Sequence, residues 1–165
     1  FRFAGIMRWP DRIKEDQVVH HPVSSLDFFP TFCQLAGTTP PANLMLDGTN
    51  FLPALKNEAP DRPKPLLWIY YNALNERRVA MRDGEWKVLA KLNISKYTNV
   101  TTENEAEVKA AELSDFQIFR ITDDVDESND LSASMPEKLD ELSKRLKANY
   151  HDLLNDSHIW EAKKP

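Results

Sequence analysis

The sequence has few cysteines, few glycines and no long apolar run. Its 165 residues include one cysteine and four glycines. A single cysteine cannot form a disulfide within the chain, which leaves the redox compartment open. No apolar run approaches the ~20 residues that a membrane-spanning helix needs. The formal net charge is −5, so we expect neither nucleic acid nor a membrane surface as a partner.

The single cysteine has no neighbours that would make its thiol reactive. Cys33 has no Lys, Arg or His within four residues, so no nearby cation lowers its pKa. We therefore interpret Cys33 as a small buried hydrophobic residue. Its segment predicts a short helix, with Asp27 as the N-cap, Pro30 in the first turn and Gly37 at the C-terminal end. Apolar residues are expected along one face of this helix: Phe28, Phe32 and Leu35.

Proline separates the chain into two parts. Nine of the eleven prolines fall within residues 1–65, and none lies between Pro65 and Pro136. The first part is therefore expected to be rich in connecting segments and the second to be regular. The apolar run 5–9 predicts one buried strand. Residues 38–65 predict a long ordered linker, pinned to a surface by Phe51, Leu52 and Leu55.

The second part predicts a small antiparallel sheet closed by a helix, an α+β arrangement. The dipeptide Asp83-Gly84 is typical of a two-residue hairpin loop. Ser134 and Glu137 form a capping-box pattern, with Pro136 inside the first turn of a long C-terminal helix. An apolar stripe on this helix is expected to lie on the sheet: Leu139, Leu142, Leu146, Tyr150 and Leu153. Alternating or branched residues predict strands at 66–71, 78–82, 85–90 and 116–122.

Five blocks of sequence follow one another along the chain: Gly5–Pro10, Ser24–Thr31 with Leu35–Gly37, Leu46–Pro53, Val79–Lys87 and Phe119–Leu131. Together and in this order they resemble the type I sulfatases of the alkaline-phosphatase superfamily. The final block departs from the family signature at Phe119, Arg120, Val125 and Asp130. The resemblance implies that residues 1–65 end an alkaline-phosphatase-like α/β catalytic domain and its linker. Residues 66–165 would then form the C-terminal sheet-and-helix subdomain.

The resemblance also implies chemistry that this chain does not carry. The family uses a formylglycine nucleophile, made from the Cys of a Cys-x-Pro-Ser-Arg motif, together with calcium and a cluster of cations. Cys33 is followed by Gln34, Leu35 and Ala36, so it does not fit that motif. We assign no catalytic residue and no metal ligand here, and no cofactor to the chain itself. We expect the C-terminal third of a sulfatase that is inactive alone, with its parent's N-terminal catalytic part as partner.

One long polar excursion is a candidate for substrate contact. Residues 91–115 interrupt the sheet, and long loops inside compact domains are often functional. The resemblance places such loops at the mouth of the sulfatase pocket. Lys96 can then meet an anionic sugar and Tyr97 can stack on a ring, with Asn72 a weaker candidate of the same kind. The alternative for the whole excursion is a variable surface insertion.

Two other groups of polar residues are expected to be solvated. His20 and His21 are adjacent, so on an extended segment they point to opposite faces rather than to one metal ion. The acidic run 123–130 has a composition suited to calcium. It lacks the Gly and Glu positions of an EF-hand loop, and we interpret it as a solvated turn.

Three functions remain open from the sequence. The chain is part of a sulfatase acting on a sulfated small molecule or polysaccharide, part of a related phosphate or phosphonate ester hydrolase, or a non-catalytic interaction module. The compartment is unknown, and a periplasmic or secreted parent fits the resemblance. Without neighbouring strands, residues 1–60 are expected either to pack on another copy as a homodimer or to hold loosely to the rest.

Overall fold

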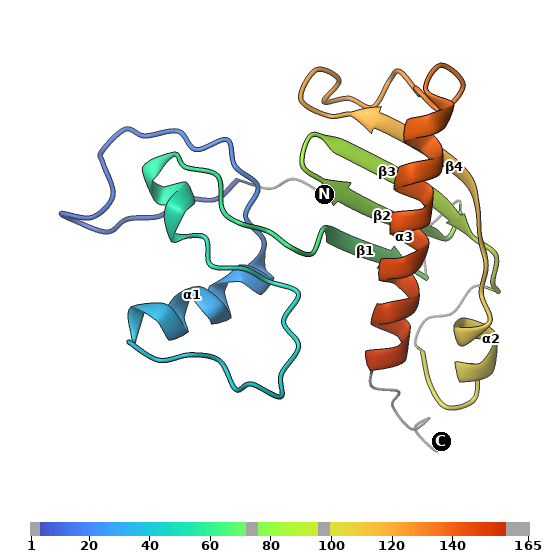
Figure 1. Ribbon diagram of the computed structural model, residues 1–165, viewed down its shortest axis with the longest axis horizontal. Helices are drawn as coiled ribbons and strands as arrows, with labels where there is room; N and C mark the ends of the chain where they lie inside the picture. Colours follow the sequence, from blue (N-terminus) through green and yellow to red (C-terminus); the bar gives the residue numbers. More distant parts are fainter. Residues whose placement is uncertain (1–3, 72–75, 96–99, 158–165) are drawn as a thin grey trace. The chain divides into compact units, whose positions relative to one another are not determined.

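The computed structural model describes residues 4–71, 76–95 and 100–157 (Figure 1). The chain divides into two compact units, Phe1–Lys64 and Pro65–Pro165. The second unit contains a four-stranded sheet in the order β1-β2-β3-β4, with every neighbouring pair antiparallel. Its strands are β1 (Leu66–Tyr70), β2 (Arg78–Asp83), β3 (Trp86–Leu92) and β4 (Leu113–Arg120). The predicted α+β class and all four predicted strands are confirmed, with shifts of up to three residues at their ends.

The hairpin between β2 and β3 forms one residue later than predicted. Asp83 pairs with Trp86, so the two-residue loop is Gly84-Glu85 rather than Asp83-Gly84. Gly84 has a φ of 57°, and hairpin turns commonly place glycine at such a first loop position. The turn still depends on the predicted glycine, but the register of the two strands differs from the predicted one.

The C-terminal helix α3 (Pro136–Asp156) lies across one face of the sheet (Figure 1). Leu142, Leu146 and Tyr150 are buried as predicted. Leu154 takes the next buried place, and the predicted Leu153 is only half-buried, because Leu154 lies one full i+4 step beyond Tyr150. On the sheet, alternate residues face the helix and complete the core, among them Val79, Met81, Val88, Ala90 and Ile118.

The start of α3 does not use the predicted capping box. Met135 is the N-cap residue and makes no side-chain cap hydrogen bond. The Ser134 hydroxyl instead donates to the carbonyl of Leu131 at 3.2 Å. Pro136 does occupy the first helical position, where its missing N–H would in any case have had no partner in the helix.

The first unit is built around a short helix, α1 (Phe28–Leu35), which follows the 3-10 turn η1 (Ser25–Asp27). Gly37 ends α1 with a φ of 69°, as predicted. The amide of Thr38 donates to Cys33 O at 3.0 Å and that of Gly37 to Gln34 O at 3.1 Å, the paired bonds of a Schellman motif.

The helix α1 buries polar residues and exposes apolar ones. Asp27 and Thr31 are 0% and 1% exposed, whereas Phe32 is 57% exposed. Asp27 is the N-cap residue of α1, as predicted, but its side chain makes no cap hydrogen bond; it accepts instead from the amides of Ser24 at 2.7 Å and Thr49 at 2.9 Å. The other residues of the predicted apolar face, Phe28 and Leu35, are also exposed. The Phe28 ring packs edge-on against Phe51, with 5.4 Å between the ring centroids. Cys33 is half-buried rather than buried as predicted.

The predicted strand at residues 5–9 is absent. These residues have no regular structure, and Ile6 is 96% exposed. A strand needs a backbone partner, and no described residue of the first unit supplies one. The linker 38–65 is ordered but irregular apart from the 3-10 turn η2 (Leu52–Lys56). Phe51 is buried, and Leu52 and Leu55 are half-buried, so these residues do anchor the linker.

Candidate functional site

The three sequence-predicted substrate residues all fall outside the described residues. Asn72 lies in the gap 72–75, and Lys96 and Tyr97 lie in the gap 96–99. The strand residues that flank the two gaps lie at the same end of the sheet, because Tyr70 pairs with Arg78, Arg78 with Lys91, and Leu92 with Leu113. The roles assigned to these residues stay predictions, but the sheet brings their flanking residues together.

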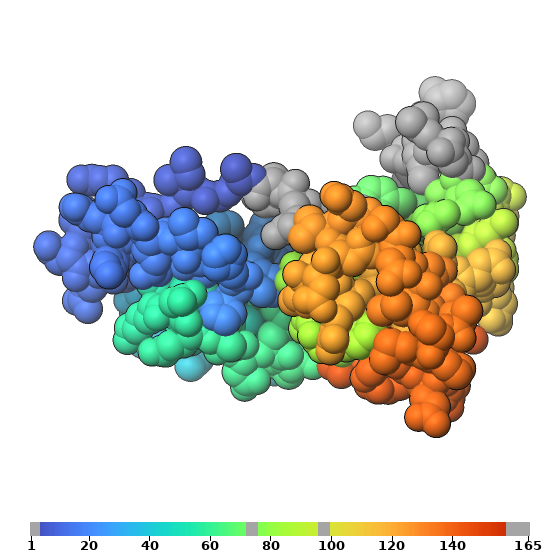
Figure 2. Space-filling model, turned by 90° about the horizontal axis from the view of Figure 1, so that it is seen from above, coloured from blue at the N-terminus to red at the C-terminus, as the bar shows by residue number. Residues whose placement is uncertain are grey.

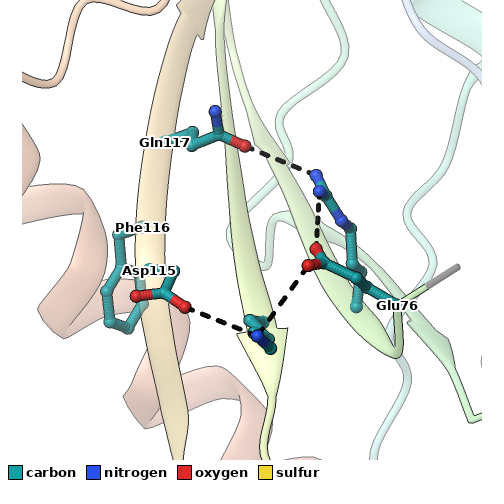
Figure 3. A pocket seen from close by; sticks show the side chains of 6 residues that line it. Glu76, Asp115, Phe116 and Gln117 are labelled. Atoms are coloured by element: carbon teal, nitrogen blue, oxygen red, sulfur yellow. Dashed lines mark hydrogen bonds and ion pairs between the residues drawn. The ribbon is translucent and has the colours of Figure 1, made fainter.

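A cluster of charged and amide side chains occupies this end of the sheet (Figure 3). It surrounds a hollow of about 250 Å³ lined by Glu76, Arg78, Lys91, Asp115, Phe116 and Gln117. The Glu76 carboxylate lies 2.8 Å from Arg78 Nη2 and 3.8 Å from Lys91 Nζ. Lys91 Nζ is also 3.9 Å from Asp115 Oδ2. Arg78 Nη1 donates to Gln117 Oε1 at 3.4 Å. One glutamate thus links two cations that come from different strands.

Strand register explains why these residues meet. Arg78 pairs with Lys91, and Leu89 pairs with Gln117. Side chains alternate between the faces of a sheet, and the neighbours Val79 and Ala90 belong to the core beneath α3. Arg78, Lys91 and Gln117 therefore project from the face opposite α3.

An irregularity in β4 completes the cluster. Leu89 pairs with Gln117 but Lys91 pairs with Ser114, so β4 carries one residue more than β3 over this stretch. The extra length is a β-bulge that includes Asp115, whose φ is 50°. Phe116 follows it, and its ring lies 5.2 Å from Nζ of Lys147 on α3. The bulge thus places the Asp115 carboxylate beside Lys91 and the Phe116 ring beside Lys147 of α3.

A second, larger hollow of about 630 Å³ adjoins the first. Glu76 and Lys91 line both hollows, and Asn93, Ser95 and Glu107 line the second. Glu107 belongs to the short helix α2 (Glu105–Lys109), and its carboxylate accepts from the Ser95 amide at 2.8 Å. Both hollows are rich in hydrogen-bonding groups, and no cysteine or histidine is among the described residues that line them.

The acidic run and the histidine pair have local roles. The Asp124 carboxylate accepts from the amides of Asn129 at 2.9 Å and Ser128 at 3.0 Å, and these bonds hold its pKa below the usual value. This turn belongs to the segment coloured orange in Figure 2. His21 Nε2 lies 3.2 Å from Asn57 O. Within residues 4–71, 76–95 and 100–157, no group of three or more His, Cys, Asp or Glu side chains is arranged to hold a metal ion.

Tyr71, at the candidate end of the sheet, and Tyr150, on α3, are electrostatic neighbours in the second unit. Tyr150 is fully buried, and Tyr71 is half-buried at the end of the described segment 4–71. Burial raises the pKa of Tyr71. Burial also raises the pKa of Tyr150, and the neighbouring Tyr71 hydroxyl raises it further. Both hydroxyls are therefore neutral across the physiological range.

Sequence reasoning missed the charged cluster. Arg78, Lys91 and Gln117 are polar residues within strands, a pattern that also fits an ordinary solvated face. Only the observed hairpin register places Arg78 opposite Lys91. No glycine in the sequence marks the bulge at Asp115.

Of the helices in the described part of the chain, none is both long enough and apolar enough to cross a membrane.

Comparison with known proteins identifies the class of this fold. A family model described as "N-sulphoglucosamine sulphohydrolase, C-terminal" matches residues 1–154. The chain belongs to this family of sulfatase C-terminal domains, which confirms the resemblance seen in the five sequence blocks.

Individual relatives agree with the family. Human steryl-sulfatase is 36% identical over 72 residues, which cover 44% of this chain and 12% of that protein. Human N-acetylgalactosamine-6-sulfatase is 43% identical over 68 residues, covering 37% of this chain and 13% of that protein. The crystal structure of Ps i-CgsB is 30% identical with a TM-score of 0.66, covering 93% of this chain and 30% of that chain. The chain thus spans less than a third of the length of each.

A further solved structure supports the fold alone. BT4656, in complex with its substrate D-glucosamine-2-N,6-O-disulfate, is 23% identical with a TM-score of 0.50. It covers 79% of this chain and 24% of that chain. Together with Ps i-CgsB it shows that the fold of this chain also occurs within longer chains.

Proposed function

We propose that this chain is the C-terminal part of a longer sulfatase that hydrolyses sulfate esters of sugars. The family match over residues 1–154 is the observation that carries the proposal. The names of similar proteins support the substrate class, since one is N-acetylgalactosamine-6-sulfatase. Another solved neighbour, 29% identical, is Ps i-CgsB in complex with k-i-k-neocarrahexaose.

The reaction centre belongs to the part of the enzyme outside this chain. The family implies a formylglycine and calcium, and neither fits the residues present. Cys33 lacks the following Pro and Arg of the modification motif, and the described residues hold no suitable group of metal ligands. We derive no catalytic step from this chain and expect it to be inactive alone.

The partner of the chain is then the catalytic part of the same enzyme. The exposed aromatic face of α1, with Phe28 at 37% and Phe29 at 47% exposure, supports this, because exposed apolar patches mark interaction surfaces. In the isolated chain the same face favours a homodimer or a loosely held first unit. A strictly monomeric chain with residues 4–60 fully protected from hydrogen exchange would contradict this part of the proposal.

The segments that contain Asn72, Lys96 and Tyr97 are proposed to contact the substrate. Replacing Lys96 and Tyr97 with alanine in the longer enzyme should raise KM for the best sulfated sugar several-fold, with kcat changed less, because these groups would contribute binding rather than chemistry. Steady-state kinetics on a panel of sulfated sugars measures both constants. Unchanged kinetics would remove the assignment.

The same enzyme preparation tests the reaction class. Matched sulfate and phosphate esters of 4-nitrophenol should be hydrolysed with a clear preference for the sulfate. A preference for the phosphate would favour the related ester hydrolases instead. Failure on both, with an intact fold, would favour a non-catalytic role.

A further inference from the structure

We propose that the hollow among Glu76, Arg78, Lys91, Asp115 and Gln117 binds an uncharged sugar ring. The inference rests on the proposed function, because it takes a saccharide as the ligand. It adds a selectivity that the proposed function does not contain: this site recognises hydroxyl groups and not the sulfate.

Charge balance disfavours an anion. Two cations, Arg78 and Lys91, face two carboxylates, Glu76 and Asp115, through ion pairs of 2.8 to 3.9 Å. A sulfate would have to compete with Glu76 for both cations, and it would meet no net positive potential. A sugar hydroxyl donates and accepts, so it can bond to a carboxylate and to an ammonium without separating them.

The ion pairs of Lys91 leave room for such hydrogen bonds. Its contacts with Glu76 and Asp115, at 3.8 and 3.9 Å, are longer than hydrogen bonds. An ammonium has three donors, and a hydroxyl placed between Lys91 and Asp115 would satisfy both. The Gln117 amide is held from two sides, since its Nε2 also donates to Asp130 Oδ2 at 3.2 Å. Its orientation is therefore set before a ligand arrives.

The strained bulge is the second observation that supports a binding role. Asp115 adopts a φ of 50°, a conformation in which glycine would be less strained. Its side chain is 73% exposed, and among the described residues it makes a single ion pair, with Lys91 at 3.9 Å. Bulges that re-aim a side chain, and residues held in strained backbone conformations, occur preferentially at functional sites. A role in ligand binding therefore explains the Asp115 carboxylate better than a contribution to the stability of the fold does.

The space suits one ring. The hollow of about 250 Å³ is smaller than the roughly 300–1,000 Å³ of pockets that enclose drug-sized ligands. The Phe116 ring is engaged by Lys147 of α3 at 5.2 Å, so we expect recognition by hydrogen bonds rather than by stacking. Figure 3 shows the polar ends of Glu76, Asp115 and Gln117 gathered around this space.

Amide chemical shifts of the isotopically labelled 165-residue chain test the inference. The probes are N-acetylgalactosamine, N-acetylglucosamine, galactose and lactose as neutral sugars, and sodium sulfate at constant ionic strength. At least one neutral sugar should shift amides of residues 76–78, 91 and 114–117, with an affinity of about millimolar. Sulfate should leave these amides unchanged. Shifts with sulfate alone, or no neutral sugar shifting these amides, would overturn the inference.

Variants separate a ligand role from a structural one. Asp115→Asn should weaken sugar binding at least tenfold, whereas Asp140→Asn removes a similar lysine-paired exposed carboxylate on α3 and should bind as the parent chain does. Asp115→Gly should raise Tm, because it relieves the strained φ, and should still lose binding. Undiminished binding by Asp115→Asn and Asp115→Gly would contradict the proposal.

The two proposals can fail separately. Sulfate release by the longer enzyme, without sugar-dependent shifts at this hollow, would overturn the sugar site and leave the proposed function intact. Sugar-dependent shifts at this hollow, together with a longer enzyme that releases no sulfate, would overturn the proposed function and leave the sugar site intact.

Discussion

At the scale of single residues, the buried Asp27 side chain links separate segments of the first unit. Its buried carboxylate bonds to the amides of Ser24 and Thr49 and to Arg62 Nη2 at 2.5 Å, and so joins three segments of chain. The sequence predicted a helix cap at this position, because an aspartate before an apolar run is typical of one. The bonds to Thr49 and Arg62 could not be foreseen, since they depend on where the linker returns.

Replacing Asp27 with asparagine should destabilise the first unit by about 3 kcal/mol, because Arg62 would be left with no compensating charge in a largely buried place. Native-state hydrogen exchange at the Thr49 and Phe51 amides measures the change. Asp47→Asn is the matched control, since its ion pair with Lys64 is exposed and should contribute at most about 1 kcal/mol. Equal effects of the two substitutions would contradict the assigned role.

The buried tyrosines predict an alkaline limit for the second unit. Burial raises the pKa values of Tyr71 and Tyr150 above the ordinary 10.0. A raised folded-state pKa gives stability that is complete below the unfolded value and is lost as pH rises above it. Between pH 9 and pH 11 the Tm should therefore fall more in the parent chain than in the Tyr71→Phe/Tyr150→Phe variant. Identical slopes in a thermal-unfolding series would show that these hydroxyls are not buried together.

At the scale of elements, hydrophobic periodicity and residue composition predicted which segments form strands and helices. They did not predict the register in which the strands pair. The strands and α3 followed from alternation and from helical spacing, because each has one face on a core. The hairpin loop was placed one residue early, at Asp83-Gly84. That register would have set Arg78 opposite Leu89 rather than Lys91. The charged cluster could therefore not be predicted from the sequence, because it depends on the strand register and on the bulge at Asp115.

The helix α1 shows a different limit. Its ends were predicted correctly because Pro30 and Gly37 act locally. Its burial was not, since Thr31 is buried and Phe32 is exposed in the described part of the chain. Local signals cannot reveal which face a neighbouring segment covers. The same reason explains why residues 5–9, though apolar, do not form a strand.

The stripe on α3 can be tested with one matched pair of leucines. Leu146→Ala removes a side chain that is 0% exposed and should cost about 3 kcal/mol through lost burial and a cavity. Leu153→Ala changes a half-buried side chain on the same helix and should cost less than half as much. Urea unfolding of the second unit measures both. Comparable losses would show that the predicted stripe, rather than the observed one, faces the sheet.

At the scale of the whole molecule, our account makes the chain a framework with a proposed sugar site and places the reaction centre in the longer enzyme. The resemblance in the five sequence blocks and the family match over residues 1–154 agree on a sulfatase C-terminal domain. The substrate residues Asn72, Lys96 and Tyr97 remain predictions. The chain spans 30% of the length of the solved relative Ps i-CgsB, so the activity belongs to a larger protein in our account.

The most direct test of this account is sulfate release by the purified 165-residue chain, compared with the longer enzyme that contains it, on the same panel of sulfated sugars. The account predicts sulfate release from the longer enzyme and none above the blank from the chain alone. Desulfation by the isolated chain would contradict it, because a reaction centre would then have to be built from these residues.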